Sequence, residues 1–307
     1  MTGSPVRVAT RGSALARWQA DHVASALRAA DPALDVDLVV VETSGDRRLD
    51  VPIWEMGGKG VFVKEVQAAV LDGRADLAVH SAKDLPAVTP DGLAVAAVPP
   101  RADPRDALVG QRLADLPPGA LVATGSVRRR AQLAWLRPDL TFVGLRGNID
   151  TRLGRVPEGG AIVMAAAALE RLGHLDRAAE LLDPSVMLPQ VGQGALAVEC
   201  RSEDARTREL LAGLDDTCSR VELEAERGFL AELGGDCDLP AAAHARVGAP
   251  GGPLAMSGLL ASLDGHVLLR RDAMLERVEA DGDAGAVGRA LARRLLDDDG
   301  GASLFDR

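Results

Sequence analysis

Strand-like and helix-like segments alternate along the first two hundred residues, and this alternation constrains the fold more than any other feature of the chain. Val6–Thr10 and Val36–Glu42 are short runs rich in β-branched residues, as in buried strands. Ser13 is a typical N-cap residue before an amphipathic segment that continues to about Ala29, which predicts a helix. Such alternation indicates parallel sheets covered by helices.

The alternation resumes after Pro99-Pro100 and gives way to a different pattern from about Thr217 onward. There, a long helical segment precedes short strand-like runs, and the last two are joined by Asp264-Gly265, which favours a hairpin. We therefore expect an α/β protein with two α/β domains and a small C-terminal α+β domain. The expected strands of the α/β part are 6–10, 36–42, 77–80, 93–98, 121–123, 141–143, 161–164 and 197–200. The expected domains are 1–98 with 195–215, then 99–194, then 216–307.

Composition excludes several classes of protein. No run approaches the roughly 18 apolar residues of a membrane span, and the first residues lack a secretion signal, so we expect a soluble, cytoplasmic protein. A net charge of −10 argues against general binding to nucleic acid or to a membrane surface. The three cysteines, Cys200, Cys218 and Cys237, match neither a disulfide framework nor a CxxC zinc site, so no metal site is expected.

Positive charge is concentrated in one part of this acidic chain. Residues 101–177 contain 12 Arg and 8 acidic residues, so this segment carries +4 and the remainder of the chain −14. A local excess of Arg in an acidic protein favours a pocket for a small polyanion over a surface for an extended one.

Polar side chains follow two of the first expected strands. Arg11 and Ser13 stand at a strand-to-helix junction, where N–H groups and a hydroxyl can bind a carboxylate or phosphate, although Ser13 can also simply cap the helix. Lys83 and Asp84 follow a later strand. A lysine there can bind anions, and an aspartate can transfer protons or stabilise a developing cation; a surface ion pair is the alternative.

Two further clusters, at 124–130 and 146–152, combine hydroxyl or amide side chains with arginines at expected strand-to-helix turns. Nucleic acid is the alternative ligand for such runs. Only seven residues of the chain are aromatic and none lies within these two clusters, which favours a pocket for a polycarboxylate.

Two glycine-rich segments complete the set of candidates. Gly57–Gly60 surrounds Lys59 without the spacing of a Walker A loop, and a solvated surface loop is a competing explanation. Cys237 lies between glycines and a proline, which places its thiol on a loop, where it can be an attachment point or a nucleophile. Cys200 and Cys218 are more typical of incidental small apolar residues.

Taken together, these segments resemble the porphobilinogen deaminases, also called hydroxymethylbilane synthases, of tetrapyrrole biosynthesis. Eight motifs of that family occur here in the family's order. They are RVATRGSALARWQA at 7–20, GGKGVFVKE at 57–65, AVHSAKDLP at 78–86, DPRDALV at 103–109, ATGSVRRRAQL at 123–133, LRGNIDTRL at 145–153, LPQVGQGALAVECR at 188–201, and the loop of Cys237. The chain departs from the usual pattern at Gly125, where the family has Ser, and at Asp236, where it has Gly.

The resemblance implies two domains like those of periplasmic binding proteins around a cleft, and a third domain whose loop cysteine, Cys237, holds one dipyrromethane cofactor by a thioether. It also implies a monomer with Asp84 as the catalytic residue and with Lys59 and Phe62 on a lid over the site. The residues implied to bind the cofactor are Lys83, Thr124, Ser126, Arg128, Arg129, Arg146 and Arg152. Those implied to bind the incoming substrate, porphobilinogen, are Arg11, Ser13, Arg171 and Gln193.

The implied reaction suits these residue types. Four porphobilinogen molecules are joined head-to-tail with loss of ammonia, and water then releases the linear hydroxymethylbilane. Deamination leaves an electrophile that is a delocalised cation once protonated, and the carboxylate of Asp84 can stabilise it. Each pyrrole ring carries two carboxylates, which the arginines of 101–177 can bind.

Two other functions remain as alternatives. A non-catalytic, two-lobed anion-binding protein explains the arginine and serine clusters but leaves the segments around Asp84 and Cys237 unexplained. A nucleic-acid-binding regulator is more distant, because the sequence shows no helix-turn-helix with a basic recognition face.

Overall fold

The chain divides into two compact units in a computed structural model that describes residues 5–43, 63–234, 239–276 and 283–304. The first unit comprises residues 1–101 and 195–220, and the second comprises 102–194 and 221–307. The chain therefore leaves the first unit after residue 101, returns to it for its last strand, and leaves it again after residue 220.

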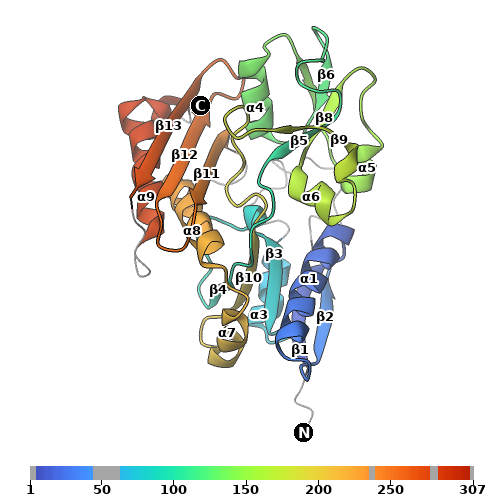
Figure 1. The fold of residues 1–307 in the computed structure, drawn as a ribbon, viewed down its shortest axis with the longest axis vertical. Helices are drawn as coiled ribbons and strands as arrows, with labels where there is room; N and C mark the ends of the chain where they lie inside the picture. Colours follow the sequence, from blue (N-terminus) through green and yellow to red (C-terminus); the bar gives the residue numbers. More distant parts are fainter. Residues whose placement is uncertain (1–4, 44–62, 235–238, 277–282, 305–307) are drawn as a thin grey trace. The chain divides into compact units, whose positions relative to one another are not determined.

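The first unit contains a sheet with the strand order β2-β1-β3-β10-β4 (Figure 1). β1 is parallel to both β2 and β3, whereas β10 is antiparallel to β3 and to β4. The strands are β1 (Val6–Arg11), β2 (Val36–Val41), β3 (Leu77–Ser81), β4 (Leu93–Ala97) and β10 (Leu196–Arg201). The helices are α1 (Ala14–Ala30), α3 (Lys64–Leu71), the 3₁₀ turn η2 (Ala82–Asp84) and α7 (Ala205–Ala212).

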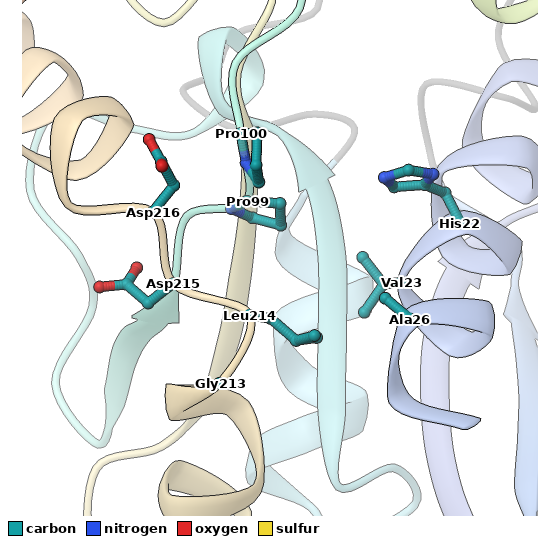
Figure 2. A pocket seen from close by; sticks show the side chains of 9 residues that line it. All are labelled: His22, Val23, Ala26, Pro99, Pro100, Gly213, Leu214, Asp215 and Asp216. Carbon is teal, nitrogen blue, oxygen red and sulfur yellow. The ribbon is translucent and has the colours of Figure 1, made fainter. Parts of the chain in front are cut away.

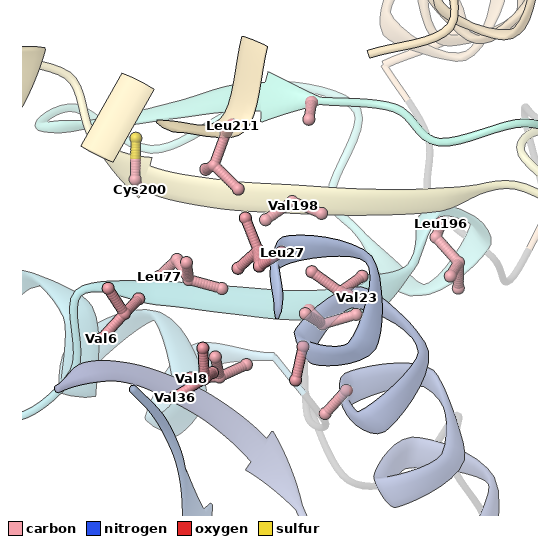
Figure 3. Packing of buried hydrophobic residues seen from close by; sticks show 14 residues of the cluster. Val6, Val8, Val23, Leu27, Val36, Leu77, Leu196, Val198, Cys200 and Leu211 are labelled. Atoms are coloured by element: carbon pink, nitrogen blue, oxygen red, sulfur yellow. The ribbon is translucent and has the colours of Figure 1, made fainter. Parts of the chain in front are cut away.

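Helix α1 packs on this sheet through one apolar face. Ser13 accepts a hydrogen bond from the Ala16 N–H and so caps the helix, as its position in the sequence predicts. Val23 and Leu27, one helical turn apart, are fully buried against strand residues such as Val198 (Figure 3). The core of the first unit is thus built from the periodic apolar residues that the sequence shows.

The second unit begins with a sheet of order β7-β6-β8-β5-β9. β6 is parallel to β7 and β8, but β5 is antiparallel to β8 and β9. The strands are β5 (Asp106–Gly110), β6 (Leu121–Ala123), β7 (Thr141–Val143), β8 (Ala161–Ala165) and β9 (Ala178–Leu182). The helices are α4 (Val127–Leu136), α5 (Ile149–Leu153), α6 (Ala166–Arg171) and the 3₁₀ turn η3 (Leu175–Arg177).

The α/β class is confirmed, but the expectation of parallel sheets is wrong for β5 and β10, and β5 and β9 are strands that the sequence pattern did not indicate. β5 and β10 are the strands at which the chain enters one sheet directly from the other. No strand–helix–strand crossover within a sheet leads into them, so the alternation of elements does not fix their direction.

The rest of the second unit is an antiparallel sheet of order β11-β12-β13 with helices α8 and α9 on it (Figure 1). The expected hairpin is present: β12 and β13 are joined by a turn at Asp264-Gly265, where Gly265 has a φ of 75°. The elements are α8 (Thr217–Glu232), β11 (Ala241–Val247), β12 (Leu254–Ala261), β13 (Leu268–Leu275), α9 (Ala284–Arg293), the π-helical turn η4 (Arg294–Asp298) and the 3₁₀ turn η5 (Gly301–Leu304). The boundary between the units falls within α8, whose residues from Val221 onward belong to the second unit.

Helices α8 and α9 touch through their backbones. A Cβ added at Gly288 would overlap the carbonyl oxygen of Ala225 and lie 2.6 Å from the backbone nitrogen of Phe229. We expect Gly288→Ala to force the helices apart and to lower the free energy of unfolding by about 1–3 kcal/mol. Denaturant titration measures this loss. Gly248→Ala is the matched control because a Cβ there meets nothing within 4 Å; equal midpoints for both variants would contradict the close packing.

Candidate active site

Four predicted site residues of the first unit lie at one edge of its sheet. Arg11 ends β1 and Ser13 caps α1, while Lys83 and Asp84 belong to the turn η2, which directly follows β3. Because β1 and β3 are neighbouring parallel strands, both pairs follow carboxyl ends at the same edge. All four side chains are partly exposed. This is the edge at which open α/β sheets bind their ligands.

The turn that carries Lys83 and Asp84 is anchored from two elements. Gln19, buried on α1, donates from Nε2 to the hydroxyl of Ser81 over 2.7 Å. The backbone N–H of Ala82 donates to the carbonyl oxygen of Ala195 over 3.0 Å, at the start of β10. The antiparallel strand β10 therefore helps to fix the backbone from which Asp84 projects.

His80, which precedes this turn, is part of a buried polar cluster. Its Nε2 lies 3.1 Å from Oε2 of Glu199 on β10, and both side chains are almost fully buried. Gln67 of α3 donates from Nε2 to both carboxylate oxygens of Glu199, over 3.1 and 2.9 Å. His80 therefore supports the strand from within the unit, while Lys83 and Asp84 are accessible to solvent.

The predicted site residues of the second unit follow three neighbouring parallel strands. Thr124 and the first turn of α4 follow β6, Arg146 and α5 follow β7, and α6 follows β8 and ends at Arg171. β7, β6 and β8 are adjacent in the sheet, so their carboxyl ends share one edge. The fold thus gathers at one edge the segments that carry Thr124, Ser126, Arg128, Arg129, Arg146 and Arg152, whereas Arg171 is at the far end of α6.

A buried carboxylate that sequence reasoning did not single out binds two of these arginines. Asp106 is fully buried, with Oδ2 at 2.8 Å from Nη1 of Arg128 and Oδ1 at 2.8 Å from Nη2 of Arg129. Arg129 also donates from Nε to Oδ1 over 2.9 Å and from Nη1 to the carbonyl of Val163 over 3.0 Å. Asp106 opens the antiparallel strand β5 opposite Ala165, the last residue of β8, and so it reaches the carboxyl edge of the parallel strands. An acidic residue that opens an otherwise apolar run, as Asp106 does, is the signal that could have found it.

The electrostatics of this cluster leave an excess of positive charge. Burial opposes ionisation of Asp106, but the charges of Arg128 and Arg129 outweigh it and hold the pKa of Asp106 well below its usual range. Burial lowers the pKa of Arg128, and the charge of Asp106 opposes that shift. Two guanidinium groups therefore face one carboxylate in a buried place, which favours a further anion.

Arg128 has two nitrogen donors that no described residue uses. Its Nη1 donates to the carbonyl oxygen of Leu188 over 2.7 Å and pairs with Asp106, but Nε and Nη2 are buried and have no hydrogen-bond partner among the described residues. Nε and Nη2 together form the side of a guanidinium that binds both oxygens of one carboxylate. The site is therefore suited to a ligand that carries carboxylates.

Gln193 and Arg171 are both predicted to bind substrate. Gln193 belongs to the loop before β10, and Arg171 binds the backbone of the same loop. Gln193 is fully buried and donates from Nε2 to the carbonyl of Pro104 over 2.7 Å and to Oδ1 of Asp106 over 2.9 Å. Arg171 donates from Nη2 to the carbonyl of Gly194 over 2.7 Å. Burial lowers the pKa of Arg171 to about 10, against the opposing charge of Glu170, so the group is still a cation at neutral pH. A direct contact of either side chain with substrate stays a prediction.

The hydroxyl groups of the β6–α4 turn hold its backbone. Ser126 caps α4 by accepting a hydrogen bond from the Arg129 N–H, and Thr124 accepts one from the Ser126 N–H. A side chain at Gly125 would place its Cβ 2.7 Å from the carbonyl oxygen of Leu145, too close without a local shift. In this turn, glycine at position 125 therefore avoids a steric overlap that the family's serine would cause.

In the second cluster of the unit, Asn148 caps α5 by accepting from the Thr151 N–H, and Arg152 donates from Nε to the carbonyl of Gly147 over 2.7 Å. Gly147 has a φ of 114°, which other residues rarely adopt. The loop that carries Arg146 is thus held by short local hydrogen bonds.

Three predicted residues, Lys59, Phe62 and Cys237, lie outside the described residues. Of the other cysteines, Cys200 is fully buried within the core of the first unit, and burial raises the pKa of its thiol. Its reading as a small apolar residue is confirmed, because a buried thiol with a raised pKa is a poor nucleophile.

A pocket of about 260 Å³ opens in the first unit beside α1, away from these clusters (Figure 2). His22 lines one side of it, and Asp215 and Asp216 line another. Both carboxylates are used within the unit: Asp215 accepts from the Val98 N–H and from Arg220, and Asp216 accepts from Ser219. The pocket contains no predicted site residue.

The described ranges contain no helix that is long and apolar enough to cross a membrane. Over the same ranges, no group of three or more His, Cys, Asp or Glu side chains is arranged to hold a metal ion.

Comparison with known proteins decides the family. A model described as "Porphobilinogen deaminase, dipyromethane cofactor binding domain" matches residues 6–209, and one described as "Porphobilinogen deaminase, C-terminal domain" matches 221–297. The chain belongs to the porphobilinogen deaminase family. It is 48% identical to the porphobilinogen deaminase of Syntrophotalea carbinolica, over 96% of this chain and 94% of that protein. It is also 48% identical to that of Nitratidesulfovibrio vulgaris strain Miyazaki F, over 97% and 96% of the two chains.

Membership of the porphobilinogen deaminases makes the chain an enzyme of tetrapyrrole biosynthesis with a dipyrromethane cofactor domain. It favours this function over the non-catalytic anion-binding protein considered above. Among solved structures, the periplasmic aliphatic sulphonate binding protein SsuA from Escherichia coli has a TM-score of 0.38 and 17% identity, covering 67% of this chain and 64% of that one. A likeness that weak carries no conclusion.

Proposed function

We propose that the chain joins four porphobilinogen molecules head-to-tail with release of ammonia, on a dipyrromethane held by Cys237, and releases linear hydroxymethylbilane by hydrolysis. One observation carries this proposal for the site: the buried Nε and Nη2 of Arg128 offer a carboxylate-binding edge at the carboxyl end of β6. A dipyrromethane carries carboxylates on each ring, so the residues present fit it. When bound, it supplies a pyrrole carbon to which the first substrate is joined.

The residues of the chain have two roles in this proposal: cationic and hydroxyl side chains bind carboxylates, and Asp84 stabilises positive charge. In the second unit, Arg128, Arg129, Arg146 and Arg152, with Thr124 and Ser126, bind cofactor carboxylates. In the first unit, Lys83 completes this set, and Arg11 and Ser13 bind the carboxylates of incoming porphobilinogen. Asp84 stabilises positive charge that develops on the pyrrole nitrogens and exchanges protons with them.

We further propose that the protein acts as a cytoplasmic monomer on this small-molecule substrate, without nucleic acid or membrane partners. Its net charge of −10 and its enclosed Arg128–Asp106 cluster support a pocket for a small anion. We also propose three domains with the boundaries given above; the separate family match to residues 221–297 supports an independent C-terminal domain.

Replacing Arg128 with lysine tests this assignment. The ammonium keeps the positive charge but cannot present two parallel donors to one carboxylate, so we expect the purified variant to lose most of its covalent dipyrromethane. Intact-mass measurement gives the fraction of chains that carry the added pyrroles. Arg130→Lys is the control, since Arg130 lies two residues further along α4 and is exposed. Equal cofactor content in both variants would refute the role given to Arg128.

A further inference from the structure

We propose that Asp106 and Gln193 are positioning residues for cofactor binding: they hold Arg128 so that its Nε–Nη2 edge faces the ligand. This inference rests on the proposed role of Arg128 in binding a cofactor carboxylate. Neither Asp106 nor Gln193 is placed in contact with the cofactor; the contact of Gln193 with substrate predicted above is a separate role.

Asp106 fixes one side of the Arg128 guanidinium. Its Oδ2 pairs with Nη1 at 2.8 Å, and the carbonyl oxygen of Leu188 accepts from the same nitrogen over 2.7 Å. Leu188 is itself held by Gln132 of α4, which accepts from its N–H over 2.8 Å and donates to its carbonyl over 3.0 Å. The Nη1 nitrogen of this planar group is held by two acceptors, which restricts rotation of the guanidinium. The opposite edge, formed by Nε and Nη2, is therefore held in one orientation.

Gln193 in turn fixes Asp106. Its Nε2 donates to Oδ1 of Asp106 and to the carbonyl of Pro104, two residues earlier in the chain, so one amide ties down both the carboxylate and its backbone. Oδ1 also receives Arg129, which leaves Oδ2 to Arg128. Without the amide, the carboxylate could turn toward Arg129 and release Arg128.

The loop that holds Gln193 is braced on both sides. Glu226 of α8, fully buried, accepts from the Gly192 N–H over 2.6 Å and from the Ala245 N–H of β11 over 2.9 Å. On the other side, Arg171 donates to the carbonyl of Gly194. The position of Gln193 is therefore set by α8 and β11, the elements between which Cys237 lies in the sequence. This chain of contacts links the C-terminal part of the unit to Arg128.

Gln193→Met tests the proposal most cleanly because methionine fills a similar volume and removes only the amide that holds Asp106, while Asp106, Arg128 and Arg129 themselves stay unchanged. We expect Gln193→Met to raise the KM for porphobilinogen or to lower the cofactor content by about tenfold. This is the effect of losing one hydrogen bond to a charged group. Asp106→Asn should lower cofactor content further. Asp103→Asn is the control, since it removes a carboxylate from a neighbouring ion pair with Arg105. Cofactor content by intact mass, KM, kcat and the thermal unfolding of cofactor-free protein are measured for each variant.

The double variant Gln193→Met, Arg128→Lys separates positioning from general stabilisation. If Gln193 acts through Arg128, its substitution causes no further loss of cofactor in the Arg128→Lys background, although it lowers thermal stability in both backgrounds. Equal losses in the two backgrounds would overturn the inference, as would unchanged cofactor content and KM in Gln193→Met.

The two levels of proposal fail differently. Full cofactor content in Arg128→Lys would refute the role of Arg128 and the inference with it. Loss of cofactor in Arg128→Lys together with a normal Gln193→Met would refute the inference alone. If Asp106→Asn does not fold, the result for Gln193→Met still tests the inference.

Discussion

Asp84→Asn should reduce turnover by about 10²–10⁴-fold, the contribution typical of a general acid–base group, while leaving the cofactor attached. An asparagine side chain keeps the shape of the carboxylate but neither carries its charge nor accepts a proton. The turn η2 is held by its neighbours, through Gln19 on Ser81 and Ala195 on Ala82, so the substitution should not disturb the backbone. Steady-state formation of hydroxymethylbilane measures kcat, and intact mass measures the cofactor.

Asp91→Asn is the control for this prediction, because Asp91 is an exposed acid of the same unit. It should behave as the parent in both measurements. Full activity of Asp84→Asn would exclude Asp84 from the chemistry. A variant that lacks both activity and cofactor would instead place Asp84 in cofactor binding.

Cys237→Ser should remove the cofactor entirely, and activity with it. A serine hydroxyl is a much weaker nucleophile than a thiolate at neutral pH and has no base assigned to activate it. The parent should exceed its sequence mass by two linked pyrrole units, and the variant should match its own sequence mass. Incubation with porphobilinogen before the measurement tests whether the parent can acquire the group.

Cys218→Ser is the control for this substitution and should keep the added mass. Cys200 is a poor alternative attachment point because it is fully buried in the core of the first unit. Added mass that persists in Cys237→Ser would move the attachment elsewhere. A bare mass for the parent, even after incubation, would refute covalent attachment.

The local elements were largely predictable from the sequence. The segments expected as strands at 77–80, 121–123 and 161–164 are β3, β6 and β8. Ser13 caps α1, which follows β1, and Ser126 caps α4, which follows β6. These features depend on neighbours within a few residues: an apolar period, a capping hydroxyl, a glycine in a turn. The clusters after β1, β3, β6 and β7 follow for the same reason.

Two kinds of information did not follow from local pattern. The direction of β5 and β10 depends on where the chain crosses between its two sheets, and no periodicity records that. Asp106 reads as one more acid beside an arginine in the DPRDALV segment. Only the antiparallel pairing of β5 with β8 places it opposite Ala165, against Arg128 and Arg129.

By itself, therefore, the sequence determined the α/β class, the strand ends that carry Arg11, Asp84 and Arg128, and the family, because these follow from local period and from motif order. The tertiary structure alone decided that Arg128 and Arg129 share a buried counter-charge and that Gln193 is turned inward to hold it. The physical reason is that strand pairing between segments far apart in the sequence determines which residues lie next to a buried charge. A buried charge without a partner would strongly destabilise the fold, so such a partner is required.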